Sequence, residues 1–255
     1  MKKVLVASFS FVLFTLVSCT ADKDTDPVSD PLNVGLVAHY TFDGNANDIS
    51  GNKLHGVLHG PVLTSDRFGK VNSAYQFDGV DDYIDLSTNA ASFNIAKPAS
   101  LSFWVKTRED IPQTVFSMCN KAASDSVISG IYLGNGVTQW LNYELITVGN
   151  VNTRQNYYLT AYESYDRFWL MDDNWHNIVV TYSDSLTNIY LDNHLLPLNT
   201  NQINDGDFGI LKDVDYVTLG TRWALRNGAF FKGSIDDFRF YDRALTSKEV
   251  AELFY

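Results

Sequence analysis

Alternation of apolar and polar residues with a period of two is the feature that most restricts how this chain can fold. Residues 36–42 place leucine, alanine, tyrosine and phenylalanine at every second position, and residues 101–106 alternate in the same way. Because successive side chains of a strand lie on opposite sides of a sheet, this pattern predicts strands that bury one face. Further runs of strand type cover 114–119, 175–182, 188–192, 216–219 and 235–241.

Turn signals separate these runs. Glycine follows aspartate or asparagine, in pairs that favour tight turns, at Asp43-Gly44, Asp78-Gly79, Asn135-Gly136 and Asp205-Gly206. Many short strands at such spacing predict an all-β sandwich or barrel and argue against alternating β-α-β units.

One clear helix signal is present, at the C-terminus. Thr246 and Glu249 have the spacing of a capping box, and the apolar residues Val250, Leu253 and Phe254 follow. The sequence therefore predicts a short terminal helix packed on the β-domain.

The N-terminus has the three parts of a secretory signal. Two lysines precede an uncharged apolar stretch over residues 4–17, which is shorter than the roughly 20 residues that span a bilayer as a helix. Ser18 lies directly before Cys19 and Leu16 three residues before it, which resembles the lipobox of bacterial lipoproteins. The resemblance implies that residues 1–18 are a removed signal peptide and that Cys19 carries lipid. The alternative is an ordinary signal peptide with an incidental cysteine.

Residues 19–33 are expected to form a disordered tether, because they are polar, acidic and interrupted by Pro27 and Pro31. Their acidic cluster resembles the surface-export signal of Bacteroidetes lipoproteins. We therefore expect residues 34–255 to form one exported domain that faces outward from the outer membrane at the cell surface. The lipid anchor would be its only contact with the membrane, since no later apolar run approaches spanning length.

The charge of the chain excludes some classes of partner. Without residues 1–18, which hold two lysines and no acidic residue, 17 basic and 30 acidic residues remain, a net charge of −13. Nucleic acid and anionic lipid both require a basic face, so neither is an expected partner. Calcium and neutral sugars are compatible with this charge.

The chain contains only two cysteines. If Cys19 carries lipid, Cys119 has no partner, and the exported domain is built without a disulfide. Cys119 lies in the strand-like run 114–119, so we expect it to be a buried, small apolar residue and not a nucleophile.

The order of several short motifs is similar to that of a known family. The segments that carry this similarity are Gly35–Asp48, Ser50–Asn52, Ala74–Gly79, Leu101–Val105, Trp175-His176, Ile189–Asp192 and Gly233–Thr246. Across residues 34–255 they resemble the laminin-G-like, concanavalin A-like lectin/glucanase domains of bacterial surface proteins. The resemblance implies a jelly-roll sandwich of two antiparallel sheets. Residues 107–170 match the family pattern least, so a specialised binding surface is expected there.

A structural calcium ion is implied by the same resemblance. Calcium binds several oxygens from carboxylates, amides and carbonyls, and residues 43–48 are rich in them. The ion would lie between this loop and the last strand, with Asp43, Asn45 and Asp236 as its ligands.

Two points bear on that expectation. Asp236 and Asp237 are expected to face opposite sides of the strand, so that only one of them would reach the ion. The alternative is that the loop after residue 42 is only a turn, and that Asp237 pairs with Arg239 or Arg243.

Carbohydrate is the second expected ligand. The faces of aromatic side chains pack against pyranose rings, while amides and charged groups hydrogen-bond with the hydroxyls. The candidate ligand residues are Trp223, Arg222, Trp140 and Tyr157. Tyr157 and Tyr158 are adjacent and would face opposite sides of a strand. The alternative is that most of these aromatic residues belong to the core.

Catalysis is not expected. The glucanases of this fold carry Glu-x-Asp-x-Glu on one strand, and this chain lacks both that pattern and other catalytic motifs. We therefore expect a lipid-anchored surface module that binds glycan without catalysis. The alternatives are an adhesion or scaffold module that binds protein, and a diverged glycoside hydrolase or lyase.

Overall fold

The computed structural model describes residues 30–93, 98–109, 111, 113–119, 128–133, 146–150, 157–161, 170–183, 186–196, 198–199, 214–222 and 230–255. Residues 31–255 form one compact unit by their internal contacts. Among the described residues, strands make up most of the regular structure, and every strand pair is antiparallel.

The first sheet has eight strands in the described part of the chain. Their order is β13 (His194–Leu195), β12 (Thr187–Leu191), β11 (His176–Tyr182), β6 (Ala99–Lys106), β16 (Lys232–Tyr241), β4 (Ala74–Asp78) and β3 (Val62–Thr64), and β1 (Leu36–Tyr40) also pairs with β16. The last strand therefore lies at the centre of this sheet, between the first strand and β6. It brings the two ends of the domain together.

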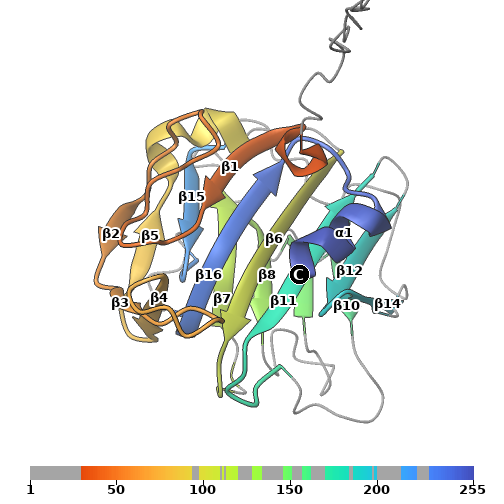
Figure 1. Cartoon of the computed structure of the whole chain (residues 1–255). Coiled ribbons are helices and arrows are strands. Elements are labelled where there is room, and N and C mark those ends of the chain that lie inside the picture. Colours follow the sequence, from red (N-terminus) through yellow and green to blue (C-terminus); the bar gives the residue numbers. More distant parts are fainter. Residues whose placement is uncertain are drawn as a thin grey trace, which may run out of the picture. The chain divides into compact units, whose positions relative to one another are not determined.

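The second sheet also has eight strands among the described residues. Their order is β14 (Leu198–Asn199), β10 (Tyr157–Ala161), β9 (Ile146–Asn150), β8 (Ile128–Leu133), β7 (Gln113–Cys119), β15 (Tyr216–Leu219), β5 (Tyr83–Asp85) and β2 (Val57–His59). Figure 1 shows the two sheets as two layers. The predicted sandwich of two antiparallel sheets is confirmed.

Aromatic side chains fill the space between the sheets. Phe238 on β16 has the rings of Tyr40, Phe103 and Phe116 around it, with centroids 5.3–6.3 Å away. All four residues are at most 1 % exposed. The predicted period of two holds in β6, where Leu101, Phe103 and Val105 belong to this core. Burial of such large apolar side chains is the main source of stability in a sandwich of this kind.

The predicted C-terminal helix is present as α1 (Ser247–Phe254). The Thr246 hydroxyl accepts a hydrogen bond from the Glu249 amide, and the Glu249 carboxylate accepts one from the Thr246 amide, which is the predicted capping box. Val250 and Leu253 of α1 pack on Val179 and its neighbours, on the outer side of the first sheet (Figure 1). Within the described residues, no helix has the length and apolar character needed to cross a membrane.

The N-terminal boundary of the domain differs from the predicted one. Residues Pro31–Asn33 form a short 3-10 helix, η1, although the sequence places them in a disordered tether. The Arg243 guanidinium donates a hydrogen bond to the Pro31 carbonyl at 2.8 Å, and Leu32 packs against the cluster beneath α1. These contacts with the C-terminal segment order the chain three residues before position 34. Residues 1–29, including Cys19, lie outside the described residues.

Cys119 is a free cysteine that is only 2 % exposed. Burial raises the pKa of its thiol to about 11, and the charge of Asp215 adds to this effect. The predicted role as a buried, unreactive residue is consistent with both observations.

Candidate functional site

Two of the three predicted calcium ligands lie in the loop after β1. The Asp43 carboxylate is exposed and accepts a hydrogen bond from the Lys70 ammonium at 2.6 Å. This hydrogen bond is the main reason why the pKa of Asp43 lies below its ordinary value. The Asn45 side-chain oxygen accepts a hydrogen bond from the Asn47 amide at 2.8 Å, which closes a local turn.

The third predicted ligand, Asp236, is buried on β16 and has an arginine partner. Arg67 Nη1 donates to Asp236 Oδ2 at 2.8 Å, and Arg67 Nη2 lies 3.3 Å from Asp237 Oδ2. Burial raises the pKa of Asp236 to about 7, and the positive charge of Arg67 only partly offsets that effect.

Asp236 and Asp237 lie on the same side of the sheet, so the predicted alternation between them is wrong. The register between β16 and β6 shifts between Asp236 and Arg239, which marks a β-bulge. Asp237 has a φ of +46° there, a conformation that residues other than glycine seldom adopt. The bulge turns the second carboxylate toward the arginine that already binds the first.

Asp237 has two further partners. His39 Nε2 lies 2.7 Å from Asp237 Oδ1, and Arg239 contacts both carboxylate oxygens at 3.0 and 3.2 Å. Burial alone would raise the pKa of Asp237, but the hydrogen bond to His39 and the charge of Arg239 outweigh it and hold the pKa well below the ordinary range. The pairing of Asp237 with Arg239, which was the alternative to a metal site, is therefore observed. Arg243 instead pairs with Glu249 at 2.7 Å.

Each of the three predicted ligands thus already accepts a hydrogen bond from the protein itself. A calcium ion needs six to eight oxygens at about 2.3–2.6 Å. A guanidinium or ammonium group on the same carboxylate oxygens blocks their approach to the ion and repels it. In this arrangement the predicted ligand set does not fit calcium. Calcium binding by these residues stays a prediction.

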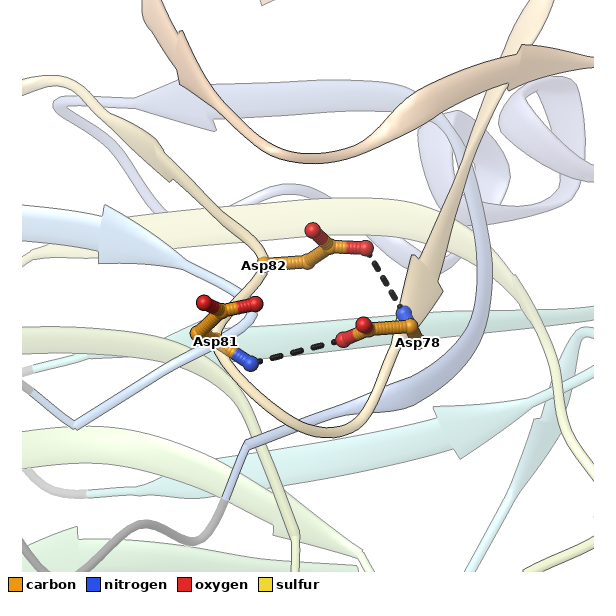
Figure 2. Close-up of side chains that lie close together, drawn as sticks. All are labelled: Asp78, Asp81 and Asp82. Carbon is orange, nitrogen blue, oxygen red and sulfur yellow. Dashed lines mark hydrogen bonds between the residues drawn. The ribbon is translucent and has the colours of Figure 1, made fainter.

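Another acidic cluster lies in the turn between β4 and β5, where oxygens of Asp78, Asp81 and Asp82 come within 4.8 Å of one another. Figure 2 shows that these side chains bond with the backbone of their own turn. Asp82 accepts a hydrogen bond from the Asp78 amide at 2.8 Å, and Asp78 accepts one from the Val80 amide at 2.7 Å. Burial raises the pKa of Asp82, with the charges of its two neighbours adding to it. The cluster has the geometry of a structural turn.

A depression of about 500 Å³ lies on the outer side of the first sheet, where β4 and β6 end and β16 begins. Its walls are polar and carry both signs of charge. Lys232 pairs with Glu109 at 2.7 Å, and Arg108 pairs with Asp173 at 3.1 Å. The charges of these four side chains therefore balance within the depression.

The register of the second sheet separates apolar rows from polar ones. One row across five strands is apolar and includes the core residues Leu219, Phe116 and Ile131. Two rows of the opposite face are Thr218–Ser117–Gly130–Gly149–Tyr158 and Thr114–Tyr132–Thr147–Thr160–Asn199. We call these ten positions the polar face of the second sheet. Within these ten positions only the tyrosines can ionise, while Asp85 extends the first row on β5 and Cys119 follows Ser117 on the same face.

Thr221 anchors the loop after β15 to the polar face. Its carbonyl accepts hydrogen bonds from the hydroxyls of Ser117 and Thr218 at 3.0 and 2.8 Å. Ser117 and Thr218 are buried, so the start of this loop lies over that end of the polar face. The hydroxyl of Thr114, on the same face, is also buried and has no hydrogen-bond partner among the described parts of the chain.

Two of the four predicted sugar-binding residues lie among the residues that the structure describes. Arg222 is half-buried and directly follows Thr221, at the polar face. Tyr157 pairs with Asn150 and lies in the row of the core residue Met118, whereas the adjacent Tyr158 lies on the polar face. The register thus favours Tyr158 over the predicted Tyr157. Trp140 and Trp223 lie outside the described residues.

Sequence comparison identifies the family. Residues 78–251 match the sequence profile of the concanavalin A-like lectin/glucanases superfamily, in its laminin G group. The match spans more than half of the chain, so the chain belongs to this superfamily, and the predicted resemblance is confirmed. No curated protein matches the chain in sequence.

Several solved structures share the fold. One is domain 4 of AbnA, a GH43 extracellular arabinanase from Geobacillus stearothermophilus, in complex with arabinotriose; it has a TM-score of 0.61 and 21% identity, over 86% of this chain and 98% of that domain. Another is the binding domain of Paraclostridial Mosquitocidal Protein 1, with a TM-score of 0.62 and 17% identity, over 88% of this chain and 52% of that one.

A third is Trypanosoma rangeli sialidase in complex with sialic acid, with a TM-score of 0.55 and 13% identity. The similarity covers 87% of this chain but only 33% of the sialidase. This chain therefore corresponds to about one third of that enzyme. At such identities, these likenesses establish the fold alone.

Proposed function

We propose that this protein is a non-catalytic module that binds a neutral glycan on the polar face of the second sheet. The observation that carries the proposal is the register, which gathers threonine, serine, glycine, tyrosine and asparagine on one face across six strands. Hydroxyl and amide groups match the hydroxyls of a sugar, and glycines let a ligand approach the backbone closely.

The unpaired hydroxyl of Thr114 supports a polar ligand at this face. A buried hydroxyl without a hydrogen-bond partner costs about 1–3 kcal/mol. A sugar hydroxyl that reached it would recover part of this cost on binding, whereas an apolar ligand would not. Because hydroxyl, amide and glycine positions make up the polar face, with the charged residues Asp85 and Arg222 only at its β15 end, the proposal specifies an uncharged sugar.

The comparison with the arabinanase domain also supports a glycan ligand. That domain was solved with arabinotriose, and almost its whole length corresponds to this chain. The fold itself serves both enzymes and binding modules, so the likeness bears on the ligand class and not on catalysis.

The ion pairs of the described glutamates support a binding role without catalysis. Glycosidases position a pair of carboxyl groups about 5–9.5 Å apart across the scissile bond. The described glutamates Glu109, Glu249 and Glu252 each face a lysine or arginine partner instead. Glu249 in addition caps α1, which is a structural role.

We further propose that lipid on Cys19 anchors the module to the outer membrane, facing outward from the cell. The support is the signal and lipobox pattern over residues 1–19. Mass spectrometry of the mature protein should find acyl chains on an N-terminal Cys19, and Cys19→Ser should release the protein from the membrane fraction. Recovery of the Cys19→Ser protein in the membrane fraction would contradict the anchor.

The sharpest test of the binding face uses Thr114→Val. This substitution keeps the shape of the side chain and removes a hydroxyl that has no hydrogen-bond partner among the described residues, so stability should hold or rise. Affinity for the best ligand from a panel of neutral oligosaccharides, beginning with arabinotriose, should fall roughly 3–10-fold by calorimetry. Tyr158→Ala should also weaken binding.

Thr181→Val is the matched control, since Thr181 is equally buried but lies on the first sheet. It should leave affinity unchanged. If no neutral glycan binds, or if Thr114→Val and Thr181→Val have the same affinity, the proposed site is wrong. Release of shorter products from a bound glycan would contradict the non-catalytic role.

A further inference from the structure

The loop between β3 and β4 brings two cationic side chains to three carboxylates from distant parts of the chain. Arg67 contacts Asp236 and Asp237 at 2.8 and 3.3 Å, and Lys70 contacts Asp43 at 2.6 Å. Asp43 follows the first strand and the other two carboxylates belong to the last strand, so the loop ties both ends of the domain together.

The loop is closed by its own hydrogen bonds, which fix the backbone from which both cationic side chains extend. The Asp66 carboxylate accepts hydrogen bonds from the amides of Phe68 and Lys70 at 2.9 and 2.8 Å. The Asp66 amide donates to the Lys70 carbonyl at 3.0 Å. Arg67 and Lys70 therefore extend from one hydrogen-bonded turn, which lowers the backbone entropy cost of placing them on the carboxylates.

Aromatic rings surround the Arg67 guanidinium and largely exclude water from it. Its guanidinium carbon lies 4.5 Å from the ring centre of Phe68 and 4.8 Å from that of Trp104. Trp104 in turn stacks on Phe254 of α1, with ring centres 5.6 Å apart. The side chains of Arg67 and Asp236 are 17% and 4% exposed. Aromatic faces and two carboxylates together enclose a cation with little access to water.

We propose that the Arg67 guanidinium and the Lys70 ammonium take the place of the calcium ion that the sequence predicts between the first loop and the last strand. They neutralise and bridge the same carboxylates that would bind the metal. The domain thus holds its two ends together with side-chain cations, and its stability is independent of calcium. Removal of both cations leaves Asp43, Asp236 and Asp237 without these partners and opens a site for a divalent cation.

The wild-type protein provides the first test. Its Tm should agree within about 1 °C between millimolar EGTA and millimolar calcium chloride, because no metal is part of its fold. Titration of calcium chloride into the protein should give no heat of binding. A Tm that falls in EGTA, or a calorimetric binding isotherm for calcium, would overturn the proposal.

The double variant Arg67→Gln/Lys70→Gln provides the second test. In EGTA its Tm should fall by about 5–15 °C, because the buried carboxylate of Asp236 loses its arginine partner. Calcium chloride should restore several degrees of that loss and should bind by calorimetry. A variant that is unfolded in EGTA and folds on addition of calcium chloride would support the proposal in the same way. A variant that gains nothing from calcium, folded or not, contradicts it.

Arg108→Gln/Lys248→Gln is the matched control, since it removes two positive charges from exposed ion pairs elsewhere. Its Tm should change little and should not respond to calcium chloride. A calcium response of the same size in this control would mean that net charge, and not the vacated site, binds the ion. That result would also overturn the proposal.

Discussion

At the scale of single residues, His176 is the titratable side chain whose environment most clearly couples protonation to folding. Its ring nitrogens lie 2.7 Å from Asp192 Oδ2 and 3.1 Å from Asp172 Oδ1. Burial opposes the charged form, but the two carboxylates outweigh it and raise the pKa of His176 above its ordinary value of about 6.5. Protonated His176 therefore joins the turn before β11 to the turn after β12.

Stability should depend on pH through His176. Because its pKa is raised in the folded state, its contribution is complete below about pH 6.5 and is lost as the pH rises through the folded pKa. Urea unfolding should show wild type about 1.5–3 kcal/mol more stable than His176→Gln at pH 5.5, with a smaller difference at pH 8.5. A difference that is constant across this range would show that His176 is not charged in the folded protein. His194→Gln, an exposed histidine, is the control.

At the scale of elements, α1 shows how a local signal and a distant contact act together. The capping box between Thr246 and Glu249 starts the helix, and Arg243 binds the same Glu249 carboxylate at 2.7 Å. The hydrogen bond from Arg243 is the main reason why the pKa of Glu249 is lowered, to about 2. The helix in turn covers Val179 on β11 and stacks Phe254 on Trp104.

Removal of the helix cap should therefore be measurable in the whole domain. Thr246→Ala should lower the Tm by about 2–4 °C, because loss of an N-cap costs about 1 kcal/mol. Ser247→Ala, at the exposed first position of α1, should have little effect. Differential scanning calorimetry of the two variants makes the comparison, and equal Tm values would show that the cap contributes nothing to stability.

The bulge in β16 is an element whose effect the sequence did not reveal. Strict alternation predicts that the side chains of Asp236 and Asp237 lie on opposite faces of the sheet. The backbone conformation of Asp237 breaks that alternation. Arg67 lies 169 residues before Asp236, so no short-range pattern links them. The composition of the 66–70 turn, with aspartate and glycine, signals a loop but not the carboxylates that its cations contact.

At the scale of the whole molecule, the sandwich is held by packing and ion pairs, with Cys119 buried as a free thiol. The thiol lies on β7, and its strand pairs with β8 and β15 near the centre of the second sheet. Access to Cys119 therefore requires that the sheet opens. Its chemical reactivity becomes a measure of global unfolding.

Labelling of Cys119 should follow the unfolding equilibrium. In a Cys19→Ser protein, where Cys119 is the only thiol, reaction with a disulfide reagent should be at least about 1,000-fold slower than in urea-unfolded protein, given ordinary domain stabilities. A core variant such as Phe238→Leu should speed labelling in proportion to its loss of stability. Fast labelling of the native wild type would show that this part of the sheet opens locally.

Much of the fold could be predicted from the sequence alone. Alternation marked β1, β6, β11, β12, β15 and β16, and the Thr246–Glu249 spacing marked α1. These features are local, because a strand or a helix cap depends on residues a few positions apart. The candidate sites were predicted less well. Asp43 and Asp236 do lie in one region, but Arg67 and Lys70 occupy their oxygens.

By itself, the sequence determined the fold class, the family and the buried state of Cys119, since these follow from local periodicity, motif order and hydrophobicity. Only the tertiary structure decided which residues share a face. Strand register put Tyr158 with Thr218 and Ser117 and left Tyr157 in the core row, because a shift of one residue exchanges the two faces. Likewise, only the folded chain could bring Arg67 to Asp236, because contacts across 169 residues depend on how the strands between them pack.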